Sequence, residues 1–164
     1  MAYRVFVSHS SADAAAVRRI STALERIDVT VYAYEDDPKP GTLLADKIKK
    51  EISASDALVV LLTSRGSASA WVQQEIGLAE MAGKLVIPLV ESDVDRRQLA
   101  LLTGREHVSY DAADPGSAMA QLSAFLTKAA SKKAMREWLV GLGVIVFVLL
   151  GLYLLNREET ETAV

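Results

Sequence analysis

The chain of 164 residues contains no cysteine and only two histidines, His9 and His107. Without cysteine it can form no disulfide, no thiolate metal site and no cysteine nucleophile, and this suits a reducing compartment. The two histidines lie far apart in the sequence, which excludes a histidine-rich metal cluster. The formal net charge is −3 and the basic residues are scattered. Because no basic stripe follows from this pattern, we expect no nucleic-acid partner.

One long hydrophobic run stands out near the end of the chain. Residues Trp138 to Leu155 read WLVGLGVIVFVLLGLYLL without a charge. As a helix this run would be about 27 Å long, close to the roughly 30 Å hydrocarbon core of a bilayer. Apolar residues occupy every face of such a helix, so the run predicts a transmembrane helix over 138–155 rather than the alternative, a buried C-terminal core helix.

The charges on either side of this run predict its orientation. Four basic residues precede it: Lys128, Lys132, Lys133 and Arg136. Only Arg157 follows it, beside three glutamates. Since lysine and arginine stay on the cytoplasmic side, we expect a single-pass protein of the cell membrane with a cytoplasmic N-terminal domain. Residues 129–137 would be a basic juxtamembrane linker, and 156–164 an acidic tail on the far side.

The N-terminal part alternates between strand and helix patterns. Short apolar runs predict strands over residues 3–8, 29–34, 57–62, 85–90 and 107–110. Apolar residues at helical spacing predict helices through Val17–Ile27, Leu43–Ile52 and Trp71–Ala82, a helical turn at Gln98–Leu102, and a last helix through Met119–Leu126 that ends in the basic Lys128–Lys133 connection. Five such alternations predict an α/β fold, a flavodoxin-like doubly wound five-stranded parallel sheet.

Three polar loops would meet at one edge of that sheet. They read HSSAD after the first strand, EDDPKPGT after the second and SRGSASAW after the third. Ligands of open α/β sheets bind beyond the carboxyl ends of the strands. We therefore expect a binding site where these loops converge.

Four stretches, YRVFVSHSSAD, EDDPKPGT, DALVVLLTS and AWVQQEIGLA, carry a family resemblance in their order and spacing. Together they resemble a Toll/interleukin-1 receptor (TIR) domain of the bacterial type, over residues 3 to about 128, so we assign 1–128 to this domain. Animal receptor and adaptor members of the family act by self-association. Many bacterial and plant members cleave NAD+ at the nicotinamide–ribose bond, giving a linear or a cyclic product, and some serve antiviral defence.

The resemblance implies roles for particular residues. Glu75, four residues after Trp71, matches the catalytic glutamate of the NAD-cleaving members. The implied substrate-binding residues are His9, Ser10, Ser11, Lys39 and Trp71. The EDDPKPGT stretch matches the BB loop, through which members self-associate, and this implies Asp37, Pro38, Pro40 and Gly41 as contacts. NAD+ would be the substrate, with no bound cofactor or metal. The resemblance also implies further copies of the chain and other defence or signalling proteins as partners, and the hydrophobic run over 138–155 adds the lipid bilayer.

Elementary chemistry explains why one carboxylate could suffice. Ordinary glycosidases need a general acid as well, because their leaving alkoxide must be protonated. The nicotinamide ring nitrogen of NAD+ is already quaternary and positive, so its departure neutralises it. What remains is to stabilise positive charge on the ribose, which one carboxylate in a low-dielectric cleft can do. On a helix, Trp71 and Glu75 lie one turn apart on the same face, so the indole could bound the pocket.

Plainer interpretations stay open for the same residues. Glu75 could be an exposed helical glutamate, Trp71 a plug at the start of its helix, and His9 a structural polar residue. Ser10 with Asp13 could cap the first helix or meet a phosphate there.

The BB-loop charges and the function itself also have alternatives. Asp36, Asp37 and Lys39 could be a solvated loop tip rather than an association surface. Two further functions compete with NAD+ cleavage. One is a non-enzymatic scaffold at the membrane, and the other is a membrane-disrupting effector whose helices pack through Gly141 and Gly143.

Overall fold

The computed structural model describes residues 2–33, 43–67 and 69–161, with side chains as far as Leu150 apart from those of Arg96 and Gln98. Ala2–Thr127 forms one compact unit, and the chain from Lys128 onward forms a second. The first unit contains the whole sheet.

The sheet has five parallel strands in the order β2-β1-β3-β4-β5. Their bounds are β1 Tyr3–Ser8, β2 Val29–Tyr32, β3 Ala57–Leu62, β4 Leu85–Glu91 and β5 Val108–Tyr110. This order confirms the predicted doubly wound five-stranded parallel sheet. Ser8, the last residue of β1, pairs with Val60 of β3. The strand predicted over 29–34 ends at Tyr32, and residue 34 lies outside the described residues.

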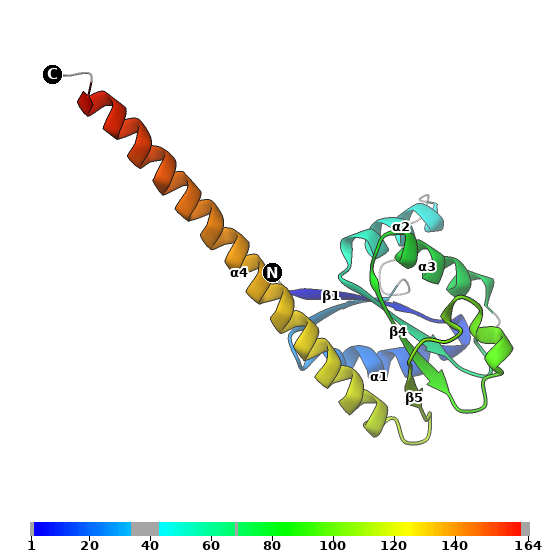
Figure 1. Cartoon of the computed structure of the whole chain (residues 1–164). Coiled ribbons are helices and arrows are strands. Elements are labelled where there is room, and N and C mark those ends of the chain that lie inside the picture. Colours follow the sequence, from blue (N-terminus) through cyan, green and yellow to red (C-terminus); the bar gives the residue numbers. More distant parts are fainter. Residues whose placement is uncertain (1, 34–42, 68, 162–164) are drawn as a thin grey trace. The chain divides into compact units, whose positions relative to one another are not determined.

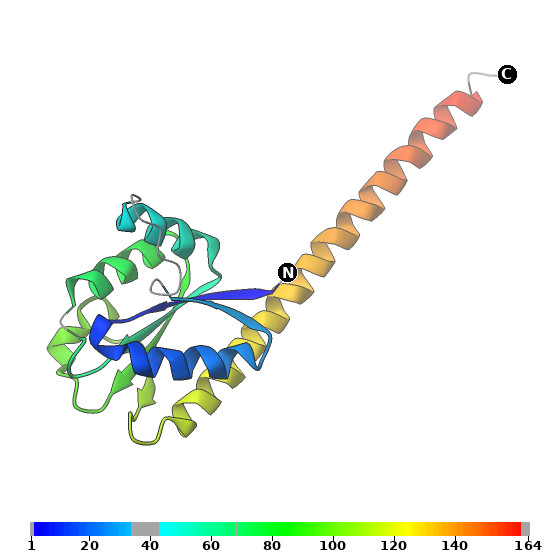
Figure 2. The same ribbon diagram turned by 180° about the vertical axis from the view of Figure 1, so that it is seen from behind.

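Helices cover both faces of the sheet. Their bounds are η1 Ser11–Asp13, α1 Ala14–Glu25, α2 Leu44–Ala54, α3 Ala70–Met81, η3 Arg96–Leu102 and α4 Gly116–Glu161. In Figures 1 and 2, α2 and α3 lie on one face, while α1 and the first turns of α4 lie on the other. Helices α1, α2 and α3 each bury apolar residues at helical spacing, as their sequences predict.

The core lies where these stripes meet the central strands. All six residues of β3 are buried, as expected of a central strand covered on both faces. On one side β3 and its neighbours pack against Ile48 and Ile52 of α2 and against Val72 and Ile76 of α3. This packing fixes α3 against the sheet, so the direction of every side chain along α3 is set by the core.

Helix α4 is longer than the sequence predicts. Its first turns bury Ala118, Leu122 and Leu126 in the domain. The predicted end of this helix at Lys128–Lys133 is wrong, because α4 continues to Glu161 without a break. Residues 129–137 (AASKKAMRE) contain no proline or glycine and consist of good helix formers. Nothing in this stretch stops the helix, so the predicted linker is helical.

Among the residues whose side chains are described, no helix is both long and apolar enough to span a membrane. This result does not support the predicted span of 138–155. Residues 151–155 of that span, and the predicted tail of 156–164, lie beyond those side chains.

Candidate functional site

A small hollow lies at the carboxyl ends of β1 and β3. These strands are neighbours in the sheet, yet the chain leaves β1 toward β2 and leaves β3 toward β4. Such a switch point is where open α/β sheets bind ligands. The hollow has a volume of about 100 Å³ and is lined by His9, Ser10, Ser11, Leu44, Ile48, Ser69, Trp71 and Glu75.

Glu75 occupies a core-facing position of α3 and also lines the hollow. The buried stripe of this helix consists of Val72, Glu75, Ile76 and Ala79, and only 2% of the Glu75 surface is exposed. The hydroxyl of Ser8 donates a hydrogen bond to Oε2 of Glu75. The interpretation of Glu75 as an exposed helical glutamate is therefore wrong, because helical spacing places it among apolar residues.

Burial also shifts the protonation of Glu75. Desolvation raises its pKa from 4.5 to about 7, although the hydrogen bond from Ser8 and the nearby His9 favour the charged form. A carboxyl group with a pKa near 7 is readily held as either acid or carboxylate at neutral pH. A strongly shifted carboxyl in a hollow is a common feature of catalytic sites.

The side chain of Trp71 lines the same hollow. It lies one turn before Glu75 on α3, and 46% of its surface is exposed. A side chain this exposed does not plug the core, because its ring lies at the rim of the hollow rather than among packed residues. It offers a flat aromatic surface to a ligand beside the buried carboxyl.

His9 is buried beside the hollow, with 2% of its surface exposed. Its Nδ1 lies 3.2 Å from the carbonyl oxygen of Val7. Because a carbonyl only accepts, Nδ1 carries the hydrogen in this bond. The imidazole is close enough to both Glu75 and Asp13 to favour their charged forms.

Asp13 ties two of the site loops together. The Oγ1 of Thr63 donates to both carboxylate oxygens of Asp13, at 3.0 and 3.1 Å, and accepts from the backbone N–H of Gly66 at 3.0 Å. Burial raises the pKa of Asp13, and the bond from Thr63 opposes that rise. A Cβ on Gly66 would lie 2.3 Å from Oδ2 of Asp13, so only glycine fits this close approach.

The predicted capping pair is half right. Ser10 is the N-cap of η1, and its hydroxyl accepts from the backbone N–H of Ala12 at 3.3 Å. Asp13 makes no such cap and bonds to Thr63 instead. The reason is that Asp13 is turned inward and buried, where the hydroxyl of a neighbouring loop is its nearest donor.

The structure brings together five of the predicted site residues, His9, Ser10, Ser11, Trp71 and Glu75, around one hollow. The remaining predictions, Lys39, Asp37, Pro38, Pro40 and Gly41, lie outside the described residues. Within the described part of the chain, no group of three or more acidic or histidine side chains could hold a metal ion.

Sequence reasoning missed Ser8, Thr63 and Gly66. Ser8 and Thr63 share one signal, because each is a polar residue that directly follows an apolar run, FV before Ser8 and ALVVLL before Thr63. In a parallel sheet such positions adjoin the ligand edge. The partners of these residues could not be inferred, since the contact between Ser8 and Glu75 joins residues 67 apart in sequence.

Comparison with solved structures gives the same fold at low identity. The TIR domains in the structure of the activated Roq1 resistosome, which directly recognises the pathogen effector XopQ, align with a TM-score of 0.51 and 23% identity, over 62% of this chain and 64% of that one. The Clostridium botulinum CMP N-glycosidase BcmB aligns with a TM-score of 0.54 and 18% identity, over 74% of this chain and 98% of that one. A 2-deoxyribosyltransferase of Bacillus psychrosaccharolyticus aligns with a TM-score of 0.53 and 12% identity, over 67% of this chain and 93% of that one.

A search with the sequence among curated proteins gave no match. The sequence profile of the TIR domain matches residues 5–126, which is most of the chain and includes β1 from Val5 and the other four strands in full. The match includes the loops and the helix that form the hollow around Glu75. The chain therefore belongs to the TIR domain family.

Proposed function

We propose that this TIR domain cleaves NAD+ at the nicotinamide–ribose bond, with Glu75 as the catalytic residue. The observation that carries the proposal is the position of Glu75, whose carboxyl is buried yet lines the hollow at the switch point of the sheet. Membership of a family with NAD-cleaving members supports the same reaction.

In the proposed reaction the bond between C1′ of the ribose and the nicotinamide nitrogen breaks. The bonding electron pair leaves with nicotinamide, whose ring nitrogen becomes neutral, and the ribose carries positive charge. The carboxylate of Glu75 stabilises that charge from within a poorly solvated site. Water then adds its oxygen to C1′ and releases a proton to solvent, giving ADP-ribose. Attack by an adenine nitrogen of the same molecule would give the cyclic product instead.

The reaction needs Glu75 in its charged form, and the substrate itself would favour that form. The positive nicotinamide ring next to a carboxyl lowers the carboxyl pKa, because opposite charges at short range stabilise one another. The pKa of about 7 in the free protein would therefore fall when NAD+ binds. Hydrogen bonding by Ser8 acts in the same direction.

The size of the hollow bears on how the substrate binds. Ligand pockets usually measure roughly 300 to 1,000 Å³, and this hollow measures about 100 Å³. We infer that it takes the nicotinamide–ribose end of NAD+, and that a second copy of the chain helps to enclose the remainder. Such a site is active only when the domains associate, and confinement to a membrane would promote association by raising the effective concentration.

Tethering of the chain to a membrane is a further part of the proposal. The large apolar side chains described between Trp138 and Leu150 are all exposed, from 44% for Leu142 to 78% for Phe147. They surround the helix rather than forming one stripe, which favours lipid over a single protein partner. Carbonate-washed membranes should retain the full chain, whereas a variant with lysine at Ile145 and Val148 should be released. Release of both proteins would contradict the tether.

The test of the enzymatic proposal is nicotinamide release from NAD+ by the full chain at high protein concentration. Glu75→Gln keeps the shape of the side chain and removes its charge, so we expect release to fall by at least about a hundredfold, the usual loss for a group that stabilises transition-state charge. Glu80→Gln is the matched control, because Glu80 lies on the same helix but pairs with Arg105 at the surface. Similar release by Glu75→Gln and the unmodified chain would end the proposal.

A non-enzymatic scaffold is the second candidate, and the small volume of the hollow is the observation that favours it. A scaffold would release no nicotinamide in any state of assembly, yet would still self-associate. If neither the unmodified chain nor any variant released nicotinamide, while the unmodified chain still self-associated, the result would favour the scaffold.

A further inference from the structure

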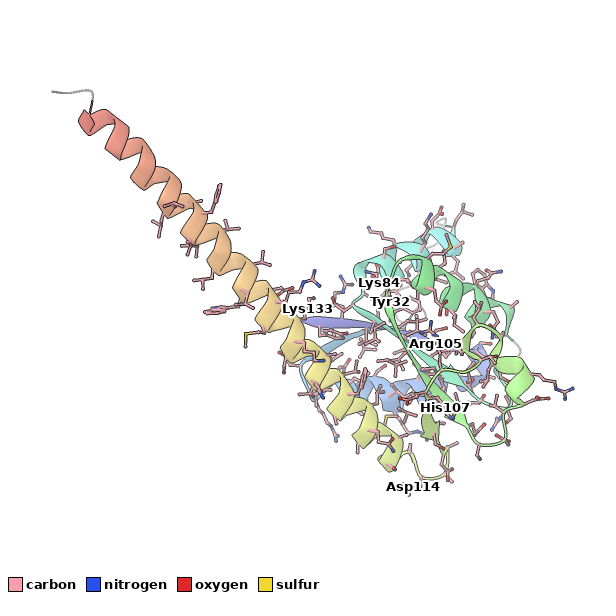
Figure 3. All side chains as sticks on the ribbon, in the orientation of Figure 1. Tyr32, Lys84, Arg105, His107, Asp114 and Lys133 are labelled. Atoms are coloured by element: carbon pink, nitrogen blue, oxygen red, sulfur yellow. The ribbon has the colours of Figure 1, made fainter. Side chains whose placement is uncertain are left out.

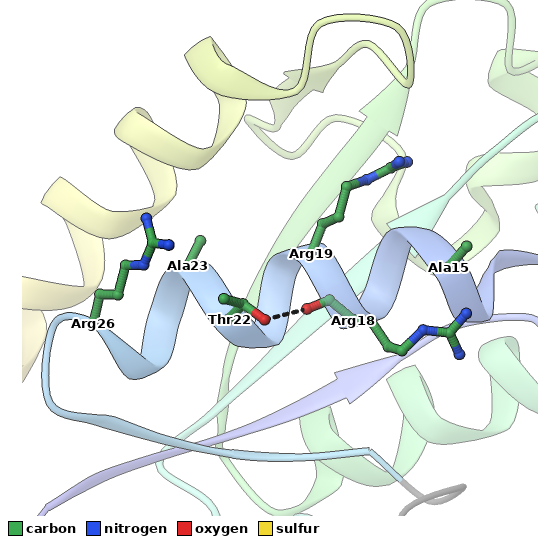
Figure 4. Close-up of a pocket in the computed structure, with 6 residues that line it drawn as sticks. All are labelled: Ala15, Arg18, Arg19, Thr22, Ala23 and Arg26. Carbon is green, nitrogen blue, oxygen red and sulfur yellow. Dashed lines mark hydrogen bonds between the residues drawn. The ribbon is translucent and has the colours of Figure 1, made fainter.

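Helix α1 presents a basic outer face. It buries Ala16, Val17, Ile20 and Leu24, and it exposes Arg18 and Arg19, with the exposed Arg26 directly after its last residue. Ala15, Arg18, Arg19, Thr22, Ala23 and Arg26 line a shallow hollow of about 390 Å³ there. In Figure 4, Arg19 and Arg26 extend from one side of the helix and Arg18 from the other.

The three guanidinium groups have no acidic partner among the described residues. Three other arginines of the chain are paired, Arg4 with Glu51 at 3.1 Å, Arg97 with Asp95 at 2.6 Å and Arg105 with Glu80 at 2.5 Å. The only acid on α1 is Glu25, its last residue. The outer face of α1 therefore keeps a net positive charge that no contact within the described domain neutralises.

Elsewhere in the same domain, three exposed aspartates, Asp93, Asp111 and Asp114, follow the paired strands β4 and β5. Asp93 follows β4, Asp111 follows β5, and the ends of these two strands pair at Glu91 and Tyr110. Asp114 lies in the loop before α4 (Figure 3). All three aspartates are exposed, and none of them forms an ion pair within the described part of the domain. Between Glu106 and Thr127 the sequence contains no lysine or arginine.

We propose that the arginine face of α1 binds the Asp93–Asp111–Asp114 surface of a second copy of this chain. The planar guanidinium of arginine matches a carboxylate with two parallel hydrogen bonds, so the two surfaces are complementary in charge and chemistry. They are different surfaces of one domain, and the contact is therefore head-to-tail, which builds rings or open filaments. The inference rests on the self-association in the proposed function but not on the chemistry of Glu75.

Paired charge reversals test this contact. The full chain is kept in one detergent buffer without NAD+, and its association is followed by sedimentation of a labelled copy. R19E/R26E and D93K/D114K should each weaken self-association by about tenfold, since each replaces attraction by repulsion across several exposed charge pairs. K49E/K50E is the matched control, because it makes the same charge change as R19E/R26E on exposed residues of α2. It should associate like the unmodified chain.

The decisive sample is the mixture of R19E/R26E with D93K/D114K. Each reversed surface then meets its complement on the other variant, so mixed chains should associate about as well as the unmodified protein. Failure of the mixture to associate, when both variants retain the melting temperature of the unmodified chain, would overturn the proposal. If D93K/D114K does not fold, D93N/D114N replaces it and should still weaken association, with no change counting against the contact.

Two other results would also overturn it. One is unchanged association of R19E/R26E. The other is a pair of findings: R19E/R26E no longer binds phosphatidylserine vesicles, and its mixture with D93K/D114K does not associate. Together these would mean that the arginine face of α1 binds a lipid surface. Nicotinamide release is measured in a separate experiment. If the variants associate as expected but the unmodified chain releases no nicotinamide, the proposed contact is supported and the proposed NAD+ cleavage is refuted.

Discussion

Replacement of Glu75 by glutamine should stabilise the fold at alkaline pH, because the buried carboxylate opposes folding when it is charged. Glu75 is 2% exposed and lies among apolar residues of α3. The amide of glutamine resembles the protonated carboxyl in shape, and its oxygen can accept the hydrogen bond from Ser8. The substitution therefore removes the charge with little change in packing.

The magnitude follows from the shift in pKa. The pKa of Glu75 rises from 4.5 to about 7 in the folded chain. One pKa unit corresponds to about 1.36 kcal/mol, so this shift amounts to about 3 kcal/mol. The folded state binds the proton more tightly than the unfolded state. The stability that this group contributes is therefore complete below pH 4.5 and is lost as the pH rises through about 7.

The expected result is a difference between the two proteins that grows with pH. At about pH 4 the free energies of unfolding should be nearly equal, and above about pH 8 the glutamine variant should be more stable by up to about 3 kcal/mol. Urea unfolding of the full chain, followed by the fluorescence of Trp71 with Trp138 replaced by phenylalanine, measures both. Glu80→Gln is the matched control, because it makes the same chemical change on the same helix at a partly exposed residue that pairs with Arg105.

A pH-independent difference between Glu75→Gln and the parent would refute the reasoning. So would a variant that is less stable than the parent above about pH 8, since that would mean that the carboxylate is stabilised by folding.

Two further predictions concern residues that hold the site. Ser8→Ala removes the hydrogen bond to the carboxylate of Glu75 and should move the acid limb of the nicotinamide-release profile up by about 1 to 2 pH units, the equivalent of a hydrogen bond to a charged group; an unmoved limb would contradict this role. Gly66→Ala should lower the free energy of unfolding by about 1 to 3 kcal/mol, because its Cβ would meet Oδ2 of Asp13 at 2.3 Å. Gly77→Ala is the control for that change. The nearest atom to its added Cβ belongs to Leu101 at 3.9 Å, and Gly77 lies within helix α3, so this substitution should be neutral or stabilising.

The sheet could be predicted from local patterns, because each strand combines a short apolar run with a polar loop after it. The run ALVVLL lacks alternation, and this indicated a central strand, which β3 is. The end of α4 could not be predicted in the same way. Basic residues suggested a connection there, whereas helix propensity over 129–137 allows the helix to continue.

The part of the candidate site that follows from the parallel topology and from the family resemblance could be predicted. The loop after β1 and the helix after β3 adjoin in any sheet of this order, so His9, Ser10 and Glu75 were expected together. The hydrogen bond between Ser8 and Glu75 was not expected, because it depends on how α3 packs on the sheet. The role of Asp13 was misassigned for the same reason, since a local cap and a long-range bond to Thr63 look alike in sequence.

The most direct test of the account is the pH dependence of nicotinamide release by the full chain at low NAD+ concentration. The charged form of Glu75 is required, so kcat/KM should rise about tenfold per pH unit below a midpoint near 7 and become constant above it. The Glu75→Gln variant should show neither the rise nor the plateau. A rate that falls as the pH rises through this midpoint, or a glutamine variant with the same profile as the unmodified chain, would contradict the account.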